Sequence, residues 1–168
     1  MTDQPSRTRT ITWDDPSISA NAARAMKGID HLRAIIRGDI PAPPIAKLLN
    51  MWLLEVEEGH AMFGITASEE LYNPIGVVHG GIACTILDSA MGCAVQSSLP
   101  EGFAYTTVDL NVHLVRGITL KTGELRAVAE AVHVGRRVAT AQARLMDMEA
   151  RLYAHATTTC LVFPIETP

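Results

Sequence analysis

The segment Asn73–Asp88, with the sequence NPIGVVHGGIACTILD, indicates how the rest of the chain is arranged. Asn73-Pro74 is a turn signal that ends the preceding loop. His79-Gly80-Gly81 then precedes a run over residues 80–97 in which nearly every position is apolar or small. Apolar positions recur there at three- and four-residue spacing, which predicts a long helix that is buried on most sides.

One carboxylate lies in the interior of this predicted helix. Asp88 is costly there unless it is paired, hydrated or used in a reaction. Thr85 and Gly92, its neighbours along the helix, are small, and we expect them to leave room for a ligand beside the carboxylate. The alternative is a structural aspartate that only bonds a neighbouring backbone or hydroxyl group.

The start of the helix is the second candidate site. The first N–H groups of a helix have no internal partner, and the helix dipole favours negative charge there. Gly80 and Gly81 carry no side chain, so a ligand can approach their backbone closely and form an oxyanion site. The alternatives are a tight turn that requires the two glycines and a His79 that only orients the loop.

Gly80 and Asp88 are too far apart to act together within one chain. They are eight residues apart in the sequence, which is about 12 Å along a helix. A hydrogen-bond donor and a general base must both lie about 3 Å from the same reacting group. If both act on one substrate, they come from two antiparallel helices, and the chain forms a homodimer with two equivalent sites at its interface.

The remaining patterns predict an α+β fold with a long central helix on a curved antiparallel sheet of five or six strands. Residues 1–18 are polar and aperiodic and are expected to form a flexible tail. Residues 19–44 form a covering helix, weakened by Gly28 and ended by Gly38, and a proline-rich connector. Within the covering helix, Asp30 could cap a second helical segment after Gly28. Residues 45–164 form the main domain.

Period-two alternation predicts the strands. A hairpin is expected over residues 51–67, with its turn at Glu58-Gly59, and four further strands over residues 105–116, 122–133, 137–146 and 152–163. Trp52, Leu54 and Val56 are expected on one face of the first strand. In the strand at 105–116, one face is expected to carry Val108, Leu110, Val112 and Leu114, and the other Thr107, Asp109, Asn111 and His113. Short connections between the later strands indicate antiparallel pairing.

Composition excludes several kinds of partner. The chain has 168 residues, 48% of them hydrophobic and 19% charged, with a formal net charge of -4. Nucleic acid binding is not expected, because it needs a clustered basic surface. No apolar run is long enough to span a membrane or to form a signal peptide, so we expect a cytoplasmic protein. The three cysteines have no metal-ligand spacing, and neither a metal nor a cofactor is expected.

Three motifs in this order resemble the hotdog-fold acyl-CoA thioesterases, and most closely the PaaI-like branch of the phenylacetate pathway. They are N-P-x-G-x-x-H-G-G-x7-D at residues 73–88, the Thr-Thr-Val-Asp-Leu-Asn-Val strand, and Val-Gly-Arg-Arg between two alanine-rich strands. The likeness covers roughly residues 30–163. It implies a helix wrapped by a sheet, dimers that often pair into tetramers, and hydrolysis of a CoA thioester.

The resemblance also implies roles for individual residues. Asp88 is similar to the acid that activates water or attacks the carbonyl, and the Gly80 N–H to the donor that polarises the thioester oxygen. Asn73 is similar to the residue that orients water or substrate, and Thr107 to the strand hydroxyl that places the water. In such dimers Asn73 and Gly80 of one chain face Asp88 and Thr107 of the other. If strand phase were shifted by one residue, Thr106 would take the role of Thr107.

The substrate-binding residues implied by the resemblance extend beyond this centre. They are expected to include Gly81, Thr106 and the Gly135, Arg136 and Arg137 hairpin, which lies beside the CoA nucleotide in the family. His79, beside Gly80, is expected to belong to the catalytic residues. The alternative for the two arginines is an ordinary solvated turn. A sister branch has Glu at the Asp88 position and Thr where this chain has Gly92, so that branch's aromatic specificity is not carried over.

The predicted function is therefore hydrolysis of an acyl-CoA to a carboxylic acid and free CoA. One alternative is a non-catalytic acyl-CoA-binding protein, which would bind CoA esters without hydrolysing them. The other is an enoyl-CoA hydratase or dehydratase, which would convert an enoyl-CoA without releasing thiol. The length and identity of the acyl chain do not follow from the sequence.

Overall fold

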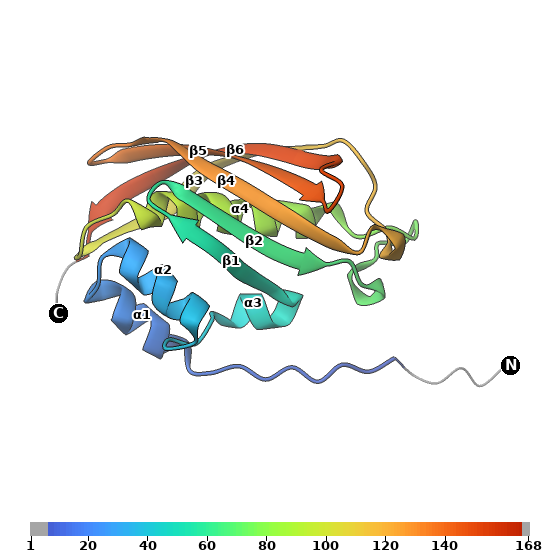
Figure 1. Cartoon of the computed structure of the whole chain (residues 1–168), viewed down its shortest axis with the longest axis horizontal. Coiled ribbons are helices and arrows are strands. Elements are labelled where there is room, and N and C mark those ends of the chain that lie inside the picture. Colours follow the sequence, from blue (N-terminus) through green and yellow to red (C-terminus); the bar gives the residue numbers. More distant parts are fainter. Residues whose placement is uncertain (1–6, 166–168) are drawn as a thin grey trace, which may run out of the picture.

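A curved six-stranded antiparallel sheet wraps around one long helix in the computed structural model, which describes residues 7–165 (Figure 1). The sheet order is β1-β2-β4-β5-β6-β3. The strands are β1 (Met51–Glu57), β2 (His60–Thr66), β3 (Phe103–Leu114), β4 (Glu124–Val134), β5 (Val138–Asp147) and β6 (Leu152–Pro164), and the central helix is α4 (Gly80–Ser97). This confirms the predicted α+β architecture. Short 3₁₀ helices, Glu69–Leu71 and Leu120–Thr122, lie in the connections.

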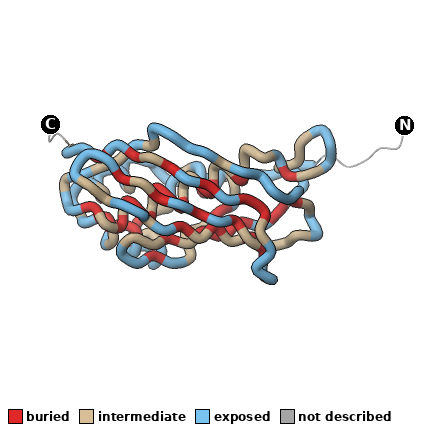
Figure 2. The backbone as a smooth tube through the Cα atoms, turned by 90° about the horizontal axis from the view of Figure 1, so that it is seen from above, coloured by how far each residue is buried: buried red, intermediate tan, exposed pale blue. Residues whose placement is uncertain are grey.

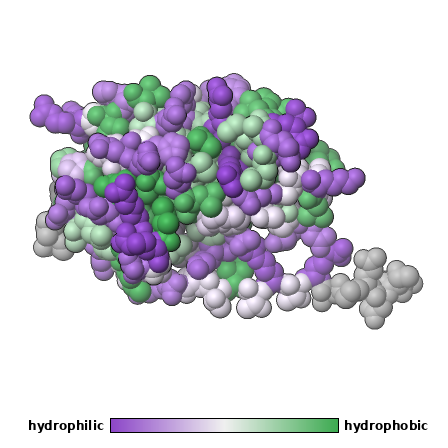
Figure 3. Space-filling model, in the orientation of Figure 1, coloured by the Kyte–Doolittle hydropathy of each residue, from purple (hydrophilic) through white to green (hydrophobic). Residues whose placement is uncertain are grey.

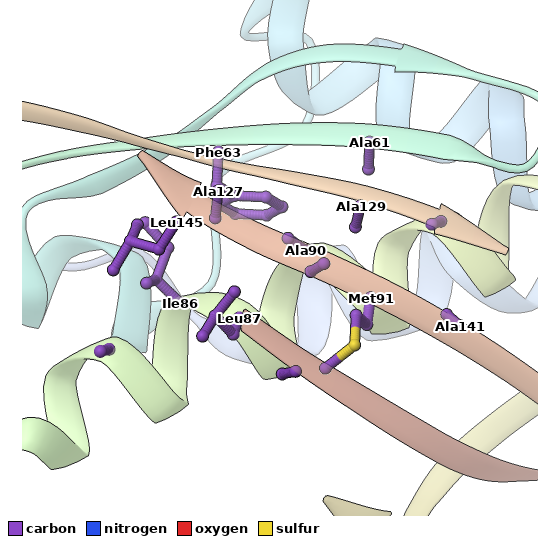
Figure 4. Packing of buried hydrophobic residues seen from close by; sticks show 14 of the residues in the cluster. Ala61, Phe63, Ile86, Leu87, Ala90, Met91, Ala127, Ala129, Ala141 and Leu145 are labelled. Atoms are coloured by element: carbon purple, nitrogen blue, oxygen red, sulfur yellow. The ribbon is translucent and has the colours of Figure 1, made fainter. Parts of the chain in front are cut away.

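Small residues on the concave face of the sheet let α4 pack closely against it. The side chains of Ala127, Ala129 and Ala141 are buried against Ala90 and Met91 of the helix (Figure 4). Phe63 and Leu145 fill the space at the other end, beside Ile86 and Leu87. Buried and exposed residues alternate along the strands, as expected for a sheet with one covered face (Figure 2). The alanine-rich faces of β4 and β5 therefore set the position of α4.

A layer of three short helices covers the opposite side of α4: α1 (Pro16–Arg24), α2 (Gly28–Arg37) and α3 (Pro44–Leu49) (Figure 1). The single covering helix expected from Ser19 is in fact two helices, and the first begins at Pro16. The second ends at Gly38, whose φ of 80° suits glycine. Its N-cap is Lys27 and not Asp30, which lies within the first turn.

The extended stretch before α1 is tied to the domain by ion pairs. Arg7 pairs with Glu69, and Arg9 pairs with Glu70. All four side chains are largely exposed, so these pairs contribute little to stability. Residues 1–6 of the predicted tail lie outside the described residues.

Register shifts in β1 and β3 interrupt the strict alternation that the sequence suggested, and others lie in the β4–β5 and β5–β6 pairings. In β1 the register shifts between Leu53 and Glu55, and Met51 and Val56 are buried, so Trp52, Leu54 and Val56 do not form one regular face. In β3 the register shifts between Thr107 and Asp109. A bulge adds one unpaired residue and changes which side chains point inward.

The β3 bulge has a direct consequence for the candidate site. Val108 is the extra residue and is 61% exposed. Before it, Thr107 pairs with the buried Cys160, and after it Leu110 pairs with the buried Thr158. Thr107 and Leu110 thus share the inner face, although strict alternation had assigned them to opposite faces.

Candidate active site

Asp88 and Thr107 form a hydrogen-bonded pair between the central helix and β3. The Thr107 hydroxyl donates to Asp88 Oδ1 at 2.9 Å, and both residues are partly buried. Thr106 is exposed on the outer face of the strand. The structure therefore places Thr107, and not Thr106, against the carboxylate, because the bulge follows directly after Thr107.

Tyr105 occupies the space that the sequence had suggested for a ligand next to Gly92. A Cβ atom added to Gly92 would lie 2.2 Å from the Tyr105 hydroxyl oxygen and 2.8 Å from Cζ. Such distances are well below van der Waals contact. The glycine in the interior of α4 is therefore required by the close approach of an aromatic ring, and the expectation of free space at Gly92 is wrong.

Raised pKa values keep the Tyr105 hydroxyl and the Cys93 thiol protonated at neutral pH. Burial raises the pKa of Tyr105 well above its ordinary value, and the nearby Cys93, Cys160 and Asp88 raise it further. Burial, with the charge of Asp88, also raises the pKa of the Cys93 thiol to about 12. Since the thiolate is the nucleophilic form of cysteine, Cys93 is not a competing nucleophile. Asp88, which accepts the Thr107 hydrogen bond, is the carboxylate of this cluster.

The start of α4 is capped by His79. The Gly81 N–H donates to His79 Nδ1 at 2.9 Å, and the Ile82 N–H donates to the His79 carbonyl at the same distance. Among the described residues, the Gly80 N–H has no acceptor. Gly80 is therefore the donor of this turn that is left for a substrate, whereas the Gly81 N–H is already occupied. Leu114 lies close to Gly80, since an added Cβ would be 2.5 Å from its Cδ1 atom.

Asn73 organises the loop that leads to this turn. Its side-chain oxygen accepts hydrogen bonds from the N–H groups of Ile75 (3.1 Å) and Val77 (3.3 Å). Asn73 and Gly80 both line a cavity of about 280 Å³, together with Arg116. The structure therefore brings Asn73 and Gly80 to one cavity, separate from the Asp88–Thr107 pair.

The two half-sites stay apart within one chain. Gly80 begins α4 and Asp88 lies two turns further on, at an axial separation of about 12 Å. The outer edge of β3 is unpaired, and apolar side chains are exposed along it: Val108 at 61%, Leu110 at 37% and Leu114 at 55%. Exposed apolar edges of this kind are typical of surfaces that pair with another chain.

The hairpin of residues 135–137 lies away from Gly80 of the same chain but only two strands from Thr107, since Thr107 and Ala139 both pair with Cys160 of β6. Near the hairpin, Ala131 bonds the carbonyl of Gly59, and the Gly59 N–H bonds Ser97 at the end of α4. The hairpin is thus at the opposite end of the helix from Gly80. The side chains of the two arginines are exposed.

Two features of the site had not been predicted. One is Tyr105, although its position two residues before Thr107 places both on the same face of a strand. The other is the lining of a cavity of about 770 Å³ between the N-terminal helices, β1 and α4, of which only the covering N-terminal helix was expected. Its lining comes from distant parts of the chain, so no local motif indicates it. Among residues 7–165 no group of His, Cys, Asp or Glu could hold a metal ion, and no helix is long and apolar enough to cross a bilayer.

Comparison with known proteins identifies the family. A sequence model described as the thioesterase superfamily matches residues 75–154. A Halobacterium salinarum protein provisionally named an esterase is 35% identical over 118 residues, which cover 67% of this chain and 76% of that protein. The chain belongs to the thioesterase superfamily. It is a thioester hydrolase, in agreement with the predicted enzyme class.

Other relatives of this thioesterase agree with the assignment. The 1,4-dihydroxy-2-naphthoyl-CoA hydrolase of Listeria monocytogenes is 22% identical over 109 residues, covering 64% of this chain and 86% of that enzyme. A thioesterase-like, phenylacetic acid degradation-related protein of Ralstonia eutropha has 29% identity and a TM-score of 0.70, covering 77% and 98% of the two chains. The Escherichia coli PaaI protein has the same hotdog fold, with a TM-score of 0.70 at 20% identity and coverage of 83% and 97%. The predicted resemblance to PaaI-like hotdog thioesterases is confirmed.

Proposed function

We propose that this thioesterase hydrolyses an acyl-CoA at sites shared between two copies of the chain. The proposal rests on one observation. Thr107 contacts Asp88 in the interior of α4, whereas the free Gly80 N–H lies at the start of the same helix, too far away to act with that pair. Each chain thus supplies a base at one position and a donor at another. Two antiparallel copies of α4 would bring one of each to the same thioester.

In this mechanism the thioester oxygen accepts a hydrogen bond from the Gly80 N–H at the positive end of α4. The partner's Asp88, oriented by the Thr107 hydroxyl, takes a proton from water. The water oxygen bonds to the carbonyl carbon, and the tetrahedral intermediate then breaks its C–S bond. The proton passes to the departing CoA sulfur, which leaves the carboxylic acid as the other product.

Asp88 could instead attack the carbonyl carbon directly and form an anhydride that water opens. A single turnover in ¹⁸O-labelled water detects the anhydride route when water opens the anhydride at the Asp88 carboxylate carbon. The label enters the Asp88 carboxylate if water attacks that carboxylate carbon of the anhydride, and it enters only the product acid when Asp88 acts as a general base.

The first test is Asp88→Asn in an assay that follows thiol release from a panel of acyl-CoAs. Loss of a positioned base lowers rates by about 10²–10⁴-fold. Asp109→Asn is the control, because Asp109 is an exposed carboxylate on β3, the strand that carries Thr107. Turnover near that of the wild type with every substrate would remove Asp88 from the mechanism. Saturable CoA-ester binding without hydrolysis by the wild type would instead indicate a binding protein.

The second test concerns the donor. Gly80→Pro removes the N–H at the first helical position, where proline is well tolerated. Gly80→Ala adds a Cβ atom but keeps the N–H, and Leu114 can rotate away from it. We expect a large loss of kcat in the proline variant and a small one in the alanine variant. Equal activities would show that the N–H is not used.

Mixing the two defective chains tests whether the site is shared. A heterodimer of Asp88→Asn and Gly80→Pro chains has one site with both defects and one site with none. Random pairing in a 1:1 mixture should therefore recover about a quarter of wild-type activity. If donor and base came from the same chain, the mixture would remain inactive. Sedimentation analysis checks that the protein is a dimer or a larger assembly of dimers.

A further inference from the structure

The cavity of about 770 Å³ beneath the N-terminal helices has no role in the mechanism described above. One wall is α4, from which Ser89, Cys93 and Gln96 contribute. The roof comes from α1, α2, α3 and the proline-rich connector. On this side of the molecule, hydrophobic side chains gather between hydrophilic ones (Figure 3). The roof residues lie before residue 75, outside the segment matched by the superfamily model.

The cavity starts next to the catalytic pair. Ser89 follows Asp88 directly on α4, and Tyr105 lies on the same inner strand face as Thr107. Tyr105 packs over Gly92 and lines the cavity. It therefore stands between the Asp88–Thr107 pair and the space under the N-terminal helices. Neither Asp88 nor Thr107 lines the cavity, so an acyl group held at Asp88 would have to pass Tyr105 to enter it.

The interior of the cavity suits an uncharged, apolar group. Leu32, Phe63 and Met51 contribute buried hydrophobic surface, and Trp52 adds an aromatic face. The charged lining residues, Asp15 and Lys47, are exposed.

His31 is the buried basic side chain of the lining. Its ring bonds Ser19 on α1 and Gln96 on α4. Burial lowers the pKa of His31, which keeps the ring neutral at pH 7. A CoA nucleotide, with its phosphates, is therefore a poor occupant.

The size of the cavity restricts its occupant further. Binding sites for drug-sized ligands have volumes of about 300–1,000 Å³. A cavity of about 150 Å³ is already enough for benzene. At about 770 Å³ the cavity is several times larger than a single ring requires.

We propose that this cavity binds the acyl group of the substrate, and that the N-terminal helices select apolar acyl groups larger than one aromatic ring. The proposal rests on the proposed acyl-CoA hydrolysis. A long fatty acyl chain and a compact polycyclic acyl group are both apolar and larger than one aromatic ring. The two are distinguished by palmitoyl-CoA and pyrenebutyryl-CoA as probes, with acetyl-CoA and phenylacetyl-CoA as the small substrates.

The experiment measures kcat/KM for these four esters with the full chain and with variants that fill the cavity. Ala42→Phe places a ring at a half-buried lining position, and Ile36→Trp adds bulk at an exposed one. Ala25→Phe is the matched control, because Ala25 belongs to the same helical layer, is exposed and does not line the cavity.

We expect the wild type to prefer one or both large esters over phenylacetyl-CoA. The filling variants should lose at least tenfold in kcat/KM for the preferred large ester, while acetyl-CoA changes less than twofold. Ala25→Phe should behave as the wild type. A wild type that prefers the small esters would overturn the proposal, and so would filling variants that affect all esters equally or none.

A binding measurement separates this proposal from the proposed function. Palmitic acid and pyrenebutyric acid are titrated into each protein by calorimetry, which needs no turnover. If no ester is hydrolysed but Ala42→Phe and Ile36→Trp weaken acid binding at least tenfold, the cavity assignment stands and the thioesterase mechanism fails. If the esters are hydrolysed but neither acid binds, the cavity assignment fails alone.

Discussion

Gly28 fixes the N-terminal helices to the central helix, and its replacement should release them. A Cβ atom at this position would lie 1.7 Å from the carbonyl oxygen of Gln96 and 2.7 Å from its carbonyl carbon. The normal separation of carbon and oxygen in close contact is about 3.3 Å. Gly28→Ala therefore requires α2 and α4 to move apart by about 1.6 Å, because both partners are backbone atoms that cannot rotate away.

That movement would disturb two hydrogen bonds between the layers. The Gly28 N–H donates to the Leu99 carbonyl at 3.0 Å, and Gln96 bonds His31 at 3.0 Å. Overpacking costs about 1–3 kcal/mol, and a lost hydrogen bond costs about 1 kcal/mol. We expect Gly28→Ala to lower the free energy of unfolding by about 2–4 kcal/mol.

Urea unfolding, followed by circular dichroism, measures this free energy. Gly117→Ala is the control, since its added Cβ would meet Val77 Cγ1 at an ordinary 3.8 Å. We expect the control to match the wild type within about 0.5 kcal/mol. If Gly28→Ala were as stable as Gly117→Ala, the close packing of α2 on α4 would be refuted.

Two further predictions concern histidines. His79→Ala should lower the unfolding free energy by about 1 kcal/mol through loss of the α4 cap, whereas His79→Asn should largely restore it, and equal stability of the two variants would argue against the cap. Burial lowers the pKa of His31 from 6.5, so the unfolded chain binds the proton first as pH falls. The stability that neutral His31 contributes should therefore be complete above pH 6.5 and be lost progressively below it. Denaturant midpoints between pH 5 and 8 measure this, and His31→Gln should make them less dependent on pH; an unchanged dependence would contradict the assignment.

The fold follows from the sequence because its signals are local. The hairpin over β1 and β2, the alanine-rich strands and the long apolar helix are each written in consecutive residues. The division of the covering helix into α1 and α2 was harder to predict from the sequence. Gly28 marks the interruption, but its cause is the backbone of Gln96, which is remote in sequence.

The candidate site shows the same limit. Asp88 and Gly80 were found from their positions on one helix, and their separation follows from helix geometry. Tyr105 and the large cavity depend on contacts between distant segments, which periodicity does not report. The choice between Thr106 and Thr107 depended on a bulge, and a bulge arises from how two strands pair rather than from either strand alone.

The bulge at Val108 divides β3 into two parts in which the side chains alternate with opposite phase. In the first, odd-numbered residues turn Tyr105 and Thr107 toward the helix side of the sheet. In the second, even-numbered residues turn Leu110, Val112 and Leu114 to that side, where Val112 packs against the core and Leu110 and Leu114 stay exposed. The Thr158 hydroxyl holds the junction by donating to the Asp109 carbonyl at 2.7 Å. A single inserted residue thus lets one strand serve chemistry at one end and hydrophobic packing at the other. Deleting Val108 would give β3 one continuous alternation of side chains. The strand could then keep the Thr107 hydroxyl beside Asp88 or its apolar residues on the helix side of the sheet, but not both.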